Sequence, residues 1–159
     1  MGELLPLAPW VPILDGDPIA AAMYDRHYSS ARSRARRQER GTLQFVGPCE
    51  RLVLMTPCRR ALFAWRRHKV RDDGQTGVEY SIFRNEGAGV ASDLIRQADR
   101  IADQRWPCER HFTFVDEDQV GGDPPGNCFR HAGWVPCGRS KERNLLILER
   151  QPDQMRSAA

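Results

Sequence analysis

The chain has 159 residues, of which 40% are hydrophobic and 28% charged, and this composition fits one soluble domain with its own core. Its net charge of +3 is modest, but all of its 24 basic residues except Lys69 and Lys141 are arginine. Three prolines break the apolar opening segment, which lacks a basic start, and no stretch reaches membrane-spanning length. These features exclude a signal peptide and a membrane protein and predict a cytoplasmic location.

The first 26 residues contain an extended segment followed by a short helix. Prolines at positions 6, 9 and 12 forbid a helix in residues 4–14 and favour an extended edge segment. Asp17 has the residue type of a helix N-cap, and Pro18 suits the first helical position. We therefore expect a short helix over residues 19–26.

A basic run without apolar periodicity follows at residues 32–40. It predicts a flexible or loosely helical arm, and a strand is expected after it at residues 42–46. Gly47 and Pro48 then predict an interruption of regular secondary structure.

The sequence pattern in the middle of the chain predicts β-strands. Residues 51–56 and 60–70 are rich in aliphatic and aromatic side chains and predict an antiparallel pair with a turn at 57–59. A polar loop at 71–77 leads into a third strand at 78–84.

The clearest helix spans residues 91–105, where apolar side chains recur at helical spacing and Pro107 ends the pattern. A strand is predicted at 111–115, followed by a short helix at 127–132 that Gly133 stops. Residues 134–138 and 145–149 predict a closing hairpin.

This order of elements predicts a mixed α/β fold, with one central twisted sheet flanked by helices. The expected organisation is a single domain over residues 1–150, with a basic arm at about 29–41 and a disordered tail at 151–159. Five scattered cysteines, an odd number without a C-x-x-C pair, predict reduced structural thiols and argue against a zinc knuckle.

The first candidate site is the sequence Arg84-Asn85-Glu86-Gly87-Ala88-Gly89, between the third predicted strand of the middle region and the long helix. Glycines at such a turn let backbone N–H groups approach a phosphate, and the positive end of the helix attracts it. An ordinary tight turn would give the same spacing.

A second candidate site is His27-Tyr28-Ser29, at the end of the first helix. It could bring a base, a phenol and a hydroxyl to one place. Asp116 follows a predicted strand and is expected at the carboxyl edge of the sheet, where ligands of open α/β sheets gather. A solvated side chain at His27 and a turn-capping carboxylate at Asp116 are the alternatives.

The third candidate is the arginine-rich arm that begins directly after this triplet. A run of arginines separated by small residues is typical of a segment that contacts nucleic-acid phosphates, although a solvated loop without a partner would look the same. Its candidate nucleic-acid-binding residues are Arg32, Arg34, Arg36, Arg37 and Arg40.

The loop Arg84–Gly89 resembles the Q/R-x-x-G-x-G/A loop of the GNAT acyltransferase superfamily, and the segment Asn127 to Trp134 resembles the short helix and turn that close a GNAT domain. The likeness covers about residues 51–150. It implies that Arg84, Asn85, Gly87 and Gly89 bind the pyrophosphate of acyl-coenzyme A or of another activated acyl donor. Phe129 departs from the family, because many GNAT enzymes place a tyrosine general acid there.

Within that superfamily, the triplet at 27–29 and the segments around Tyr80, Asp116 and Trp134 resemble the Mom-like branch of phages. That branch modifies adenines in phage DNA and protects the genome from restriction. The resemblance implies His27, Tyr28 and Asp116 at the reacting centre, in the host cytoplasm, with a bound iron on the same three residues as a further implication.

These observations predict a DNA-modifying acyltransferase that acts on the exocyclic amine of adenine, with DNA as its partner and no membrane. A base inside a duplex is out of reach, so a flipped-out base or a single strand is expected. Two alternatives stay open: an N-acetyltransferase for a small amine or a protein lysine, and a non-catalytic nucleic-acid-binding protein on this fold.

Overall fold

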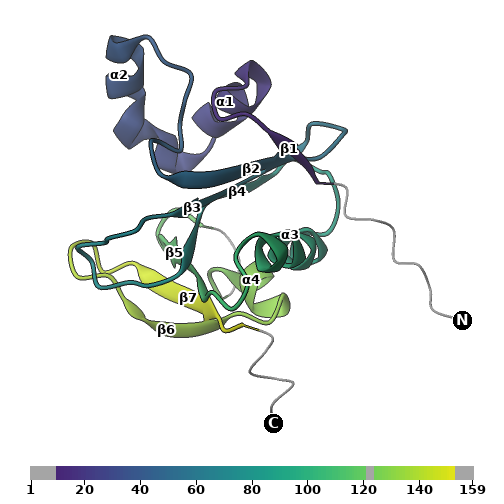
Figure 1. Cartoon of the computed structure of the whole chain (residues 1–159), viewed down its shortest axis with the longest axis vertical. Helices are drawn as coiled ribbons and strands as arrows, with labels where there is room; N and C mark the ends of the chain where they lie inside the picture. The colour runs from purple at the N-terminus through teal and green to yellow at the C-terminus, as the bar shows by residue number, and fades with distance from the viewer. Residues whose placement is uncertain (1–9, 121–123, 153–159) are drawn as a thin grey trace, which may run out of the picture.

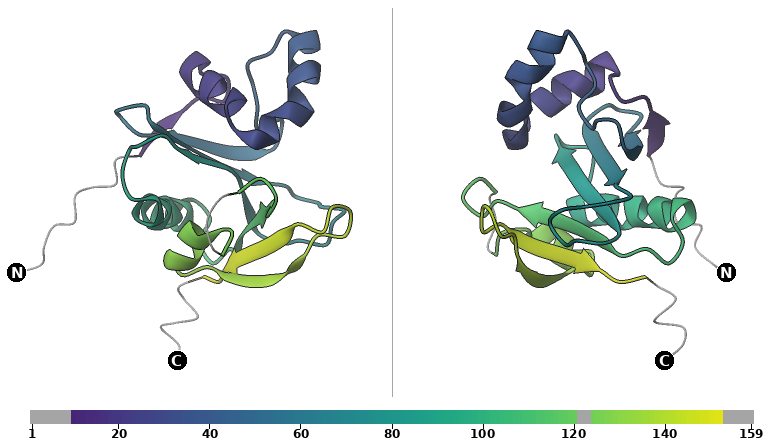
Figure 2. Two further views of the ribbon diagram at one scale, coloured as in Figure 1. Left: turned by 180° about the vertical axis from the view of Figure 1, so that it is seen from behind. Right: turned by 60° about the vertical axis from the view of Figure 1, so that its left-hand side comes forward.

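The computed structural model describes residues 10–120 and 124–152, which form one bent sheet with helices on both faces (Figure 1). The sheet has seven strands in the order β1-β2-β3-β4-β5-β7-β6. It bends into two leaves, with β1 to β4 in one and β5 to β7 in the other, as two further views show (Figure 2). Helices α3 and α4 lie inside the bend, and α1 and α2 cover the outer side of the first leaf. This confirms the predicted mixed α/β class with a central sheet.

Most predicted elements occur where the sequence placed them. The strands are β1 (Val11–Ile13), β2 (Glu50–Met55), β3 (Ala61–Arg67), β4 (Val78–Asn85), β5 (His111–Val115), β6 (Val135–Arg139) and β7 (Leu146–Arg150). The helices are α1 (Pro18–Asp25), η1 (Tyr28–Ser30), α2 (Ala31–Arg40), α3 (Ala91–Arg105) and α4 (Asn127–His131), of which η1 is a 3₁₀ turn. The closing hairpin is present, and its second strand β7 pairs with both β5 and β6.

In the first third of the chain, the strand predicted at 42–46 was wrong, and of the predicted flexible or loosely helical arm only the helical alternative is present. The basic run forms the regular helix α2, ended by Gly41 in the left-handed region with φ +62°, because Arg37 docks it on α1 through an ion pair with Asp25 at 2.6 Å. Residues 42–46 form no strand, because the Asp15 carboxylate accepts the backbone N–H groups of Phe45, Val46 and Gly47, which therefore need no strand partner.

The start of α1 confirms the predicted cap. The Asp17 carboxylate accepts the backbone N–H groups of Ile19 and Ala20, each at 3.0 Å, and Pro18 is the first helical residue. Residues 4–9 of the predicted extended segment and 153–159 of the predicted tail lie outside the described residues. No helix in the described ranges is long and apolar enough to cross a membrane.

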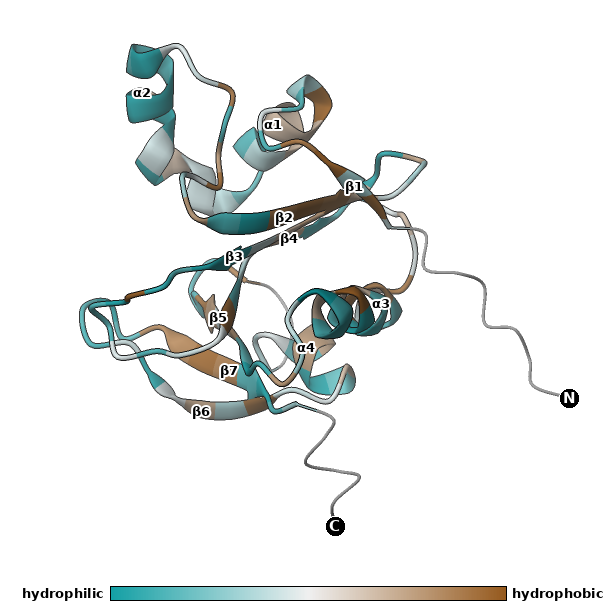
Figure 3. Cartoon of the chain, in the orientation of Figure 1, coloured by the Kyte–Doolittle hydropathy of each residue, from teal (hydrophilic) through white to brown (hydrophobic). Residues whose placement is uncertain are grey.

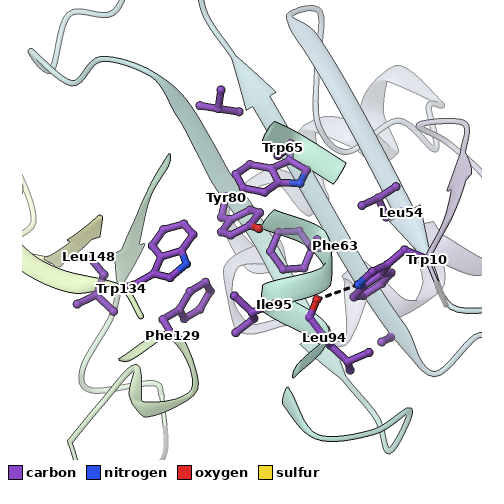
Figure 4. Packing of buried hydrophobic residues seen from close by; sticks show 14 of the residues in the cluster. Trp10, Leu54, Phe63, Trp65, Tyr80, Leu94, Ile95, Phe129, Trp134 and Leu148 are labelled. Carbon is purple, nitrogen blue, oxygen red and sulfur yellow. Dashed lines mark hydrogen bonds between the residues drawn. The ribbon is translucent and has the colours of Figure 1, made fainter. Parts of the chain in front are cut away.

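Each face of the first leaf has its own apolar core. The α3 side holds all four tryptophans, and each is at most 5% exposed. Trp10 Nε1 donates to the carbonyl of Leu94 at 2.9 Å, which ties the start of the described chain to α3 (Figure 4). On the other side, Ala20 and Met23 of α1 pack against Val53, Leu62 and Ile82 of the sheet. The helix α2, by contrast, is hydrophilic (Figure 3).

A buried carboxylate joins α3 to the second leaf. Asp99, 2% exposed, accepts hydrogen bonds from Tyr80 Oη at 2.7 Å and Trp134 Nε1 at 3.0 Å, and its Oδ1 lies 3.1 Å from Nδ1 of His111. Arg150 pairs with Asp103 on the next turn through two contacts of 2.9 Å. Burial and the nearby Asp99 charge raise the pKa of Tyr80 well above its ordinary value. This network fixes the long helix on the sheet.

Both outer strands of the sheet contain a proline. Pro12 lies in the middle of β1, which pairs only with β2, and Pro136 lies in β6, which pairs only with β7. All five residues of β6 are exposed. Proline is tolerated here because an edge strand leaves one row of backbone groups unpaired.

Candidate active site

The central feature of the site is a gap between β4 and β5. These are the only parallel neighbours in the described sheet, and they pair only where Val78–Tyr80 meets His111–Thr113. Residues 81–85 of β4 continue without a partner in β5. The two leaves therefore separate at the carboxyl ends of these strands, where open α/β sheets bind ligands.

A bulge in β4 lies at the point where the strands separate. Ala64 of β3 pairs with Ile82 and Trp65 with Tyr80, so Ser81 is an extra residue without a partner in β3. Its hydroxyl donates to the carbonyl of Ala64 at 3.2 Å. Such a bulge bends its strand and redirects the side chains beside it.

The glycine loop lies between β4 and α3, as predicted. Asn85 shapes it: its Oδ1 accepts the backbone N–H groups of Gly87 at 3.2 Å and Ala88 at 2.9 Å, and its Nδ2 donates to the carbonyl of Gly89 at 2.8 Å. Gly87 has φ +98°, and a Cβ added at Gly87 or Gly89 would meet open space. The glycines therefore serve the backbone conformation and leave the outer side of the loop open.

The helix α3 begins without a side-chain cap. Its N-cap is Val90, which is 63% exposed and cannot accept a hydrogen bond through its side chain, and Ser92 lies inside the helix. The first N–H groups of the helix thus face outward with the positive end of its dipole. The Arg84 guanidinium, predicted to bind the donor, instead binds Glu86 and donates to the carbonyl of Arg26 at 2.8 Å.

On the α1 side of the sheet, a cavity of about 340 Å³ opens beside the gap. It brings together two of the predicted catalytic residues, Tyr28 and Asp116. Its walls come from α1, α2 and the turn between them, from the loop after α2, from β3, β4 and the end of β5, and from the β6–β7 hairpin. The lining residues are Tyr24, Tyr28, Ser29, Arg32, Ser33, Phe45, Arg66, Glu79, Tyr80, Ser81, Ile82, Phe114, Asp116, Arg143 and Leu145. A second cavity of about 340 Å³ shares four of these residues, Arg32, Phe114, Arg143 and Leu145, and extends the space outward.

Tyr28 places its phenol against the strand end that carries Asp116. Partial burial raises the pKa of Tyr28, and a hydrogen bond from the backbone of Asp116 opposes that rise. The phenol is therefore a proton donor at neutral pH. The Tyr28 ring also stacks on His27, with 4.4 Å between the ring centroids.

His27 uses one ring nitrogen within the turn and the other on β4. Its Nδ1 accepts the backbone N–H of Ser29 at 3.2 Å and lies 2.8 Å from Ser29 Oγ, so the side chain caps η1. Burial and, to a lesser extent, the positive charge of Arg84 lower the pKa of His27 to about 4, against a hydrogen bond to the carbonyl of Phe83. His27 is therefore neutral at pH 7, and its role as a base stays a prediction.

Asp116 is engaged on both carboxylate oxygens. Its Oδ1 accepts the backbone N–H of Asp118 at 3.2 Å, which is the turn-capping arrangement that the sequence left open, and its Oδ2 lies 3.3 Å from Arg143. Sequence reasoning missed Arg143, because nothing in the hairpin sequence indicates that its loop folds back over the end of β5.

The iron site implied by the Mom-like resemblance finds no support in this geometry. Within residues 10–120 and 124–152 no three His, Cys, Asp or Glu side chains gather closely enough to hold a metal. His27 has no free lone pair to offer, since Nδ1 accepts from Ser29 and the other nitrogen faces a carbonyl oxygen.

The five predicted nucleic-acid-binding arginines fall into two groups on α2. Arg34 donates to the carbonyl of Asp25 at 2.6 Å, and Arg37 pairs with Asp25 and lies over the Tyr24 ring at 4.7 Å, so both hold α2 on α1. Arg32, Arg36 and Arg40 are exposed, four residues apart on one helix face, and form no hydrogen bond or ion pair within the described part of the chain.

Comparison with solved structures gives the fold. The crystal structure described as "histone acetyltransferase HPA2 and related acetyltransferase" from Corynebacterium glutamicum superposes with a TM-score of 0.55 over 90% of this chain and 95% of that one, at 12% identity. The chain has a GNAT-like fold. No family model matches it, and no curated protein does. The Mom-like branch gains no support from these comparisons.

Phe129, at the position where many GNAT enzymes carry a tyrosine acid, is part of the core. Phe129 on α4 is 8% exposed, and its ring packs against Trp134 at 5.1 Å and Phe83 at 6.1 Å between centroids. Tyr28, on the opposite side of the sheet, supplies a phenol to the cavity instead.

Proposed function

We propose that the chain is an acyl-coenzyme A-dependent N-acyltransferase whose acceptor is an amine on a small molecule or a protein lysine. One observation carries this proposal: the unpaired stretch 81–85 of β4 leads from a cavity that holds Tyr28 and Asp116 and is lined by Ser81 and Ile82 to the open glycine loop and the uncapped start of α3. The GNAT-like fold, shared with a protein described as an acetyltransferase, supports it.

The donor side fits a pyrophosphate. The outward N–H groups at the start of α3 and the loop at Gly87 and Gly89 would hold the phosphates, with Asn85 keeping the loop in shape. When bound, the donor supplies an acyl thioester. The amine of the acceptor attacks its carbonyl carbon, the carbon–sulfur bond breaks, and the thiolate leaves.

The acceptor side fits an extended amine such as a lysine side chain. The two joined cavities give it a path from the surface to the gap. We assign Tyr28 as the acid that protonates the departing thiolate, because its raised pKa keeps the phenol protonated and Phe129 carries no proton to give. Asp116 would attract the amine and accept its proton after Arg143 shifts by a small distance.

The acid assignment is tested with Tyr28→Phe and, as the matched control, Tyr24→Phe in the same cavity. With acetyl-coenzyme A and a panel of amines and lysine peptides, thiol release by Tyr28→Phe should fall about 10²-fold in kcat with little change in KM for the donor. Tyr24→Phe should stay within about twofold. Full activity of Tyr28→Phe would remove Tyr28 from this role.

The donor assignment is tested by Gly87→Val against Gly74→Val. Both glycines have positive φ, +98° and +77°, and at both a Cβ would meet open space, so the two variants carry similar backbone strain. Only Gly87 lies in the proposed phosphate loop. Coenzyme A binding measured by calorimetry should weaken about tenfold for Gly87→Val and stay near wild type for Gly74→Val. Equal losses would contradict the assignment.

A second candidate acceptor is the exocyclic amine of adenine in DNA, and the unpaired arginines on α2 favour it. Arg32, Arg36 and Arg40 form a stripe that begins at the cavity, since Arg32 lines it. A strand held on the stripe would bring a flipped-out base to Tyr28. Replacing all three with Ala should reduce the salt dependence of oligonucleotide binding by about two to three phosphate contacts.

The product itself separates the two acceptors. Plasmid DNA from cells that express the protein is digested to nucleosides and weighed. A new adenine derivative would establish adenine in DNA as the acceptor. Unmodified nucleosides together with acetylation of free amines or lysine peptides would establish the first proposal.

A further inference from the structure

An ion cluster connects the glycine loop to the turn that carries Tyr28. The Glu86 carboxylate receives Arg26 through two contacts, Nε at 2.9 Å and Nη2 at 2.8 Å, and it also receives Arg84 Nε. Arg84 Nη1 in turn donates to the backbone carbonyl of Arg26 at 2.8 Å. The Glu86 carboxylate thus binds both Arg26 and Arg84, and Arg84 also binds the backbone of Arg26.

Two residues of this cluster are sequence neighbours of the glycine loop and of the turn that carries Tyr28. Glu86 directly precedes Gly87 of the phosphate loop, and Arg26 directly precedes His27, which caps η1 and stacks on Tyr28. The loop end is itself anchored, since the backbone N–H of Glu86 donates to the carbonyl of Arg60 at 2.6 Å. Glu86 thus links the loop directly to the Tyr28 turn through side chains, in addition to the contact between His27 and the carbonyl of Phe83 on β4.

The cluster is able to change its geometry. The side chains of Arg26, Arg84 and Glu86 are 51%, 30% and 27% exposed, so water can replace their contacts at low cost. Hydrogen bonds from both arginines lower the pKa of Glu86 to about 2, so the carboxylate stays charged over the whole physiological range. These partly exposed ion pairs position the turn, but they can break and re-form in water.

We propose that Glu86 is a positioning residue that transmits donor binding at the glycine loop to the turn that carries Tyr28. Phosphates bound beside Gly87 order residues 86–89, and Glu86 then holds Arg26 and orders residues 26–30. The acceptor cavity takes its final shape only when the donor is in place. This inference rests on the proposed donor site, and the experiment below separates the two.

The experiment is hydrogen–deuterium exchange with mass spectrometry on the full chain, with and without coenzyme A as the probe. The turn offers reporters, because the backbone N–H groups of His27 and Ser30 are hydrogen-bonded to carbonyls and that of Ser29 to the His27 ring. The variant is Glu86→Gln. Its control is Glu109→Gln, which removes the charge from a similar arginine pair with Arg67 at 2.8 Å, away from both cavities and the loop.

In wild type and Glu109→Gln, coenzyme A should slow exchange both in residues 84–92 and in residues 26–30. In Glu86→Gln it should slow exchange in 84–92 alone, and without coenzyme A the turn should exchange about fivefold faster than in wild type. Arg26→Met should give the same pattern, and its combination with Glu86→Gln should add nothing further.

Two outcomes would overturn the proposal. The first is equal protection of the turn in wild type and Glu86→Gln, and the second is wild-type protection that stops at the loop. If coenzyme A instead leaves residues 84–92 unprotected in wild type, the donor site itself is refuted. The ligand-free comparison then decides: faster exchange in Glu86→Gln supports the link between loop and turn, and unchanged exchange refutes it.

Discussion

The two sides of the first leaf are held by different kinds of polar contact. On the α3 side, Asp99 is buried and accepts from Tyr80, His111 and Trp134 on three separate parts of the sheet. On the α1–α2 side, the ion pairs join partly exposed groups, such as Arg26 with Glu86. A buried network fixes one geometry because every broken contact leaves an unpaired group, whereas exposed pairs exchange with water. The α3 side is thus held rigidly, whereas the α1–α2 side can adjust.

The largest expected effect tests the rigid side. Asp99→Ala leaves the Tyr80 hydroxyl, the Trp134 N–H and His111 buried without their partner and should lower the free energy of unfolding by about 3–5 kcal/mol, measured by urea denaturation. Asp93→Ala, on the same helix with a 60% exposed side chain, should cost at most about 0.5 kcal/mol. Similar losses in both variants would erase the contrast between the two sides.

An intermediate effect is expected at Arg37, which docks α2 on α1. Arg37→Met keeps much of the packing on Tyr24 but removes the pair with Asp25, whose side chain is 43% exposed, and should cost about 1–2 kcal/mol. Arg36→Met on the exposed face of the same helix is the control and should be neutral in the same urea titration. A loss of unfolding free energy at Arg37 as large as that at Asp99 would show that the α1–α2 side is held as rigidly as the α3 side.

The smallest effect is a change in pH dependence. His27 has a pKa of about 4 when folded and 6.5 as its ordinary value, so the neutral ring stabilises the fold fully above pH 6.5 and this stabilisation is lost as the pH falls from 6.5 towards 4. His27→Asn keeps a side-chain acceptor for the Ser29 N–H without a titrating group. The slope of unfolding free energy against pH should then decrease by up to about one proton in that window. An unchanged slope would place His27 in contact with water.

The sequence predicted what local pattern determines. The bounds of α3 and β5 follow from apolar periodicity and from Pro107, and the loop at Arg84–Gly89 was found from its glycines and flanking elements. Periodicity reports which residues face a core, and these segments face one on their whole length.

Prediction from the sequence failed where the structure of a segment depends on residues that are distant in the chain rather than on its own local pattern. Asp15 binds the backbone at Phe45, about thirty positions away, so the predicted strand is a loop. Arg37 pairs with Asp25, so the arm predicted to be flexible or loosely helical is a regular helix. The convergence of Tyr28 with Asp116 was inferred through a family resemblance, whereas Arg143 and Glu86 escaped notice because an isolated charge in a loop resembles any solvated side chain.

The prolines in β1 and β6 have a consequence for association between molecules. An open sheet of seven strands offers two edges to which a strand of another molecule could add. Pro12 and Pro136 each remove one N–H donor from such an edge, and the irregular pairing between Pro136 and Gly138 distorts the ladder further. Both borders of the sheet are thereby poor templates, so crowded copies of the chain should stay separate rather than polymerise edge to edge.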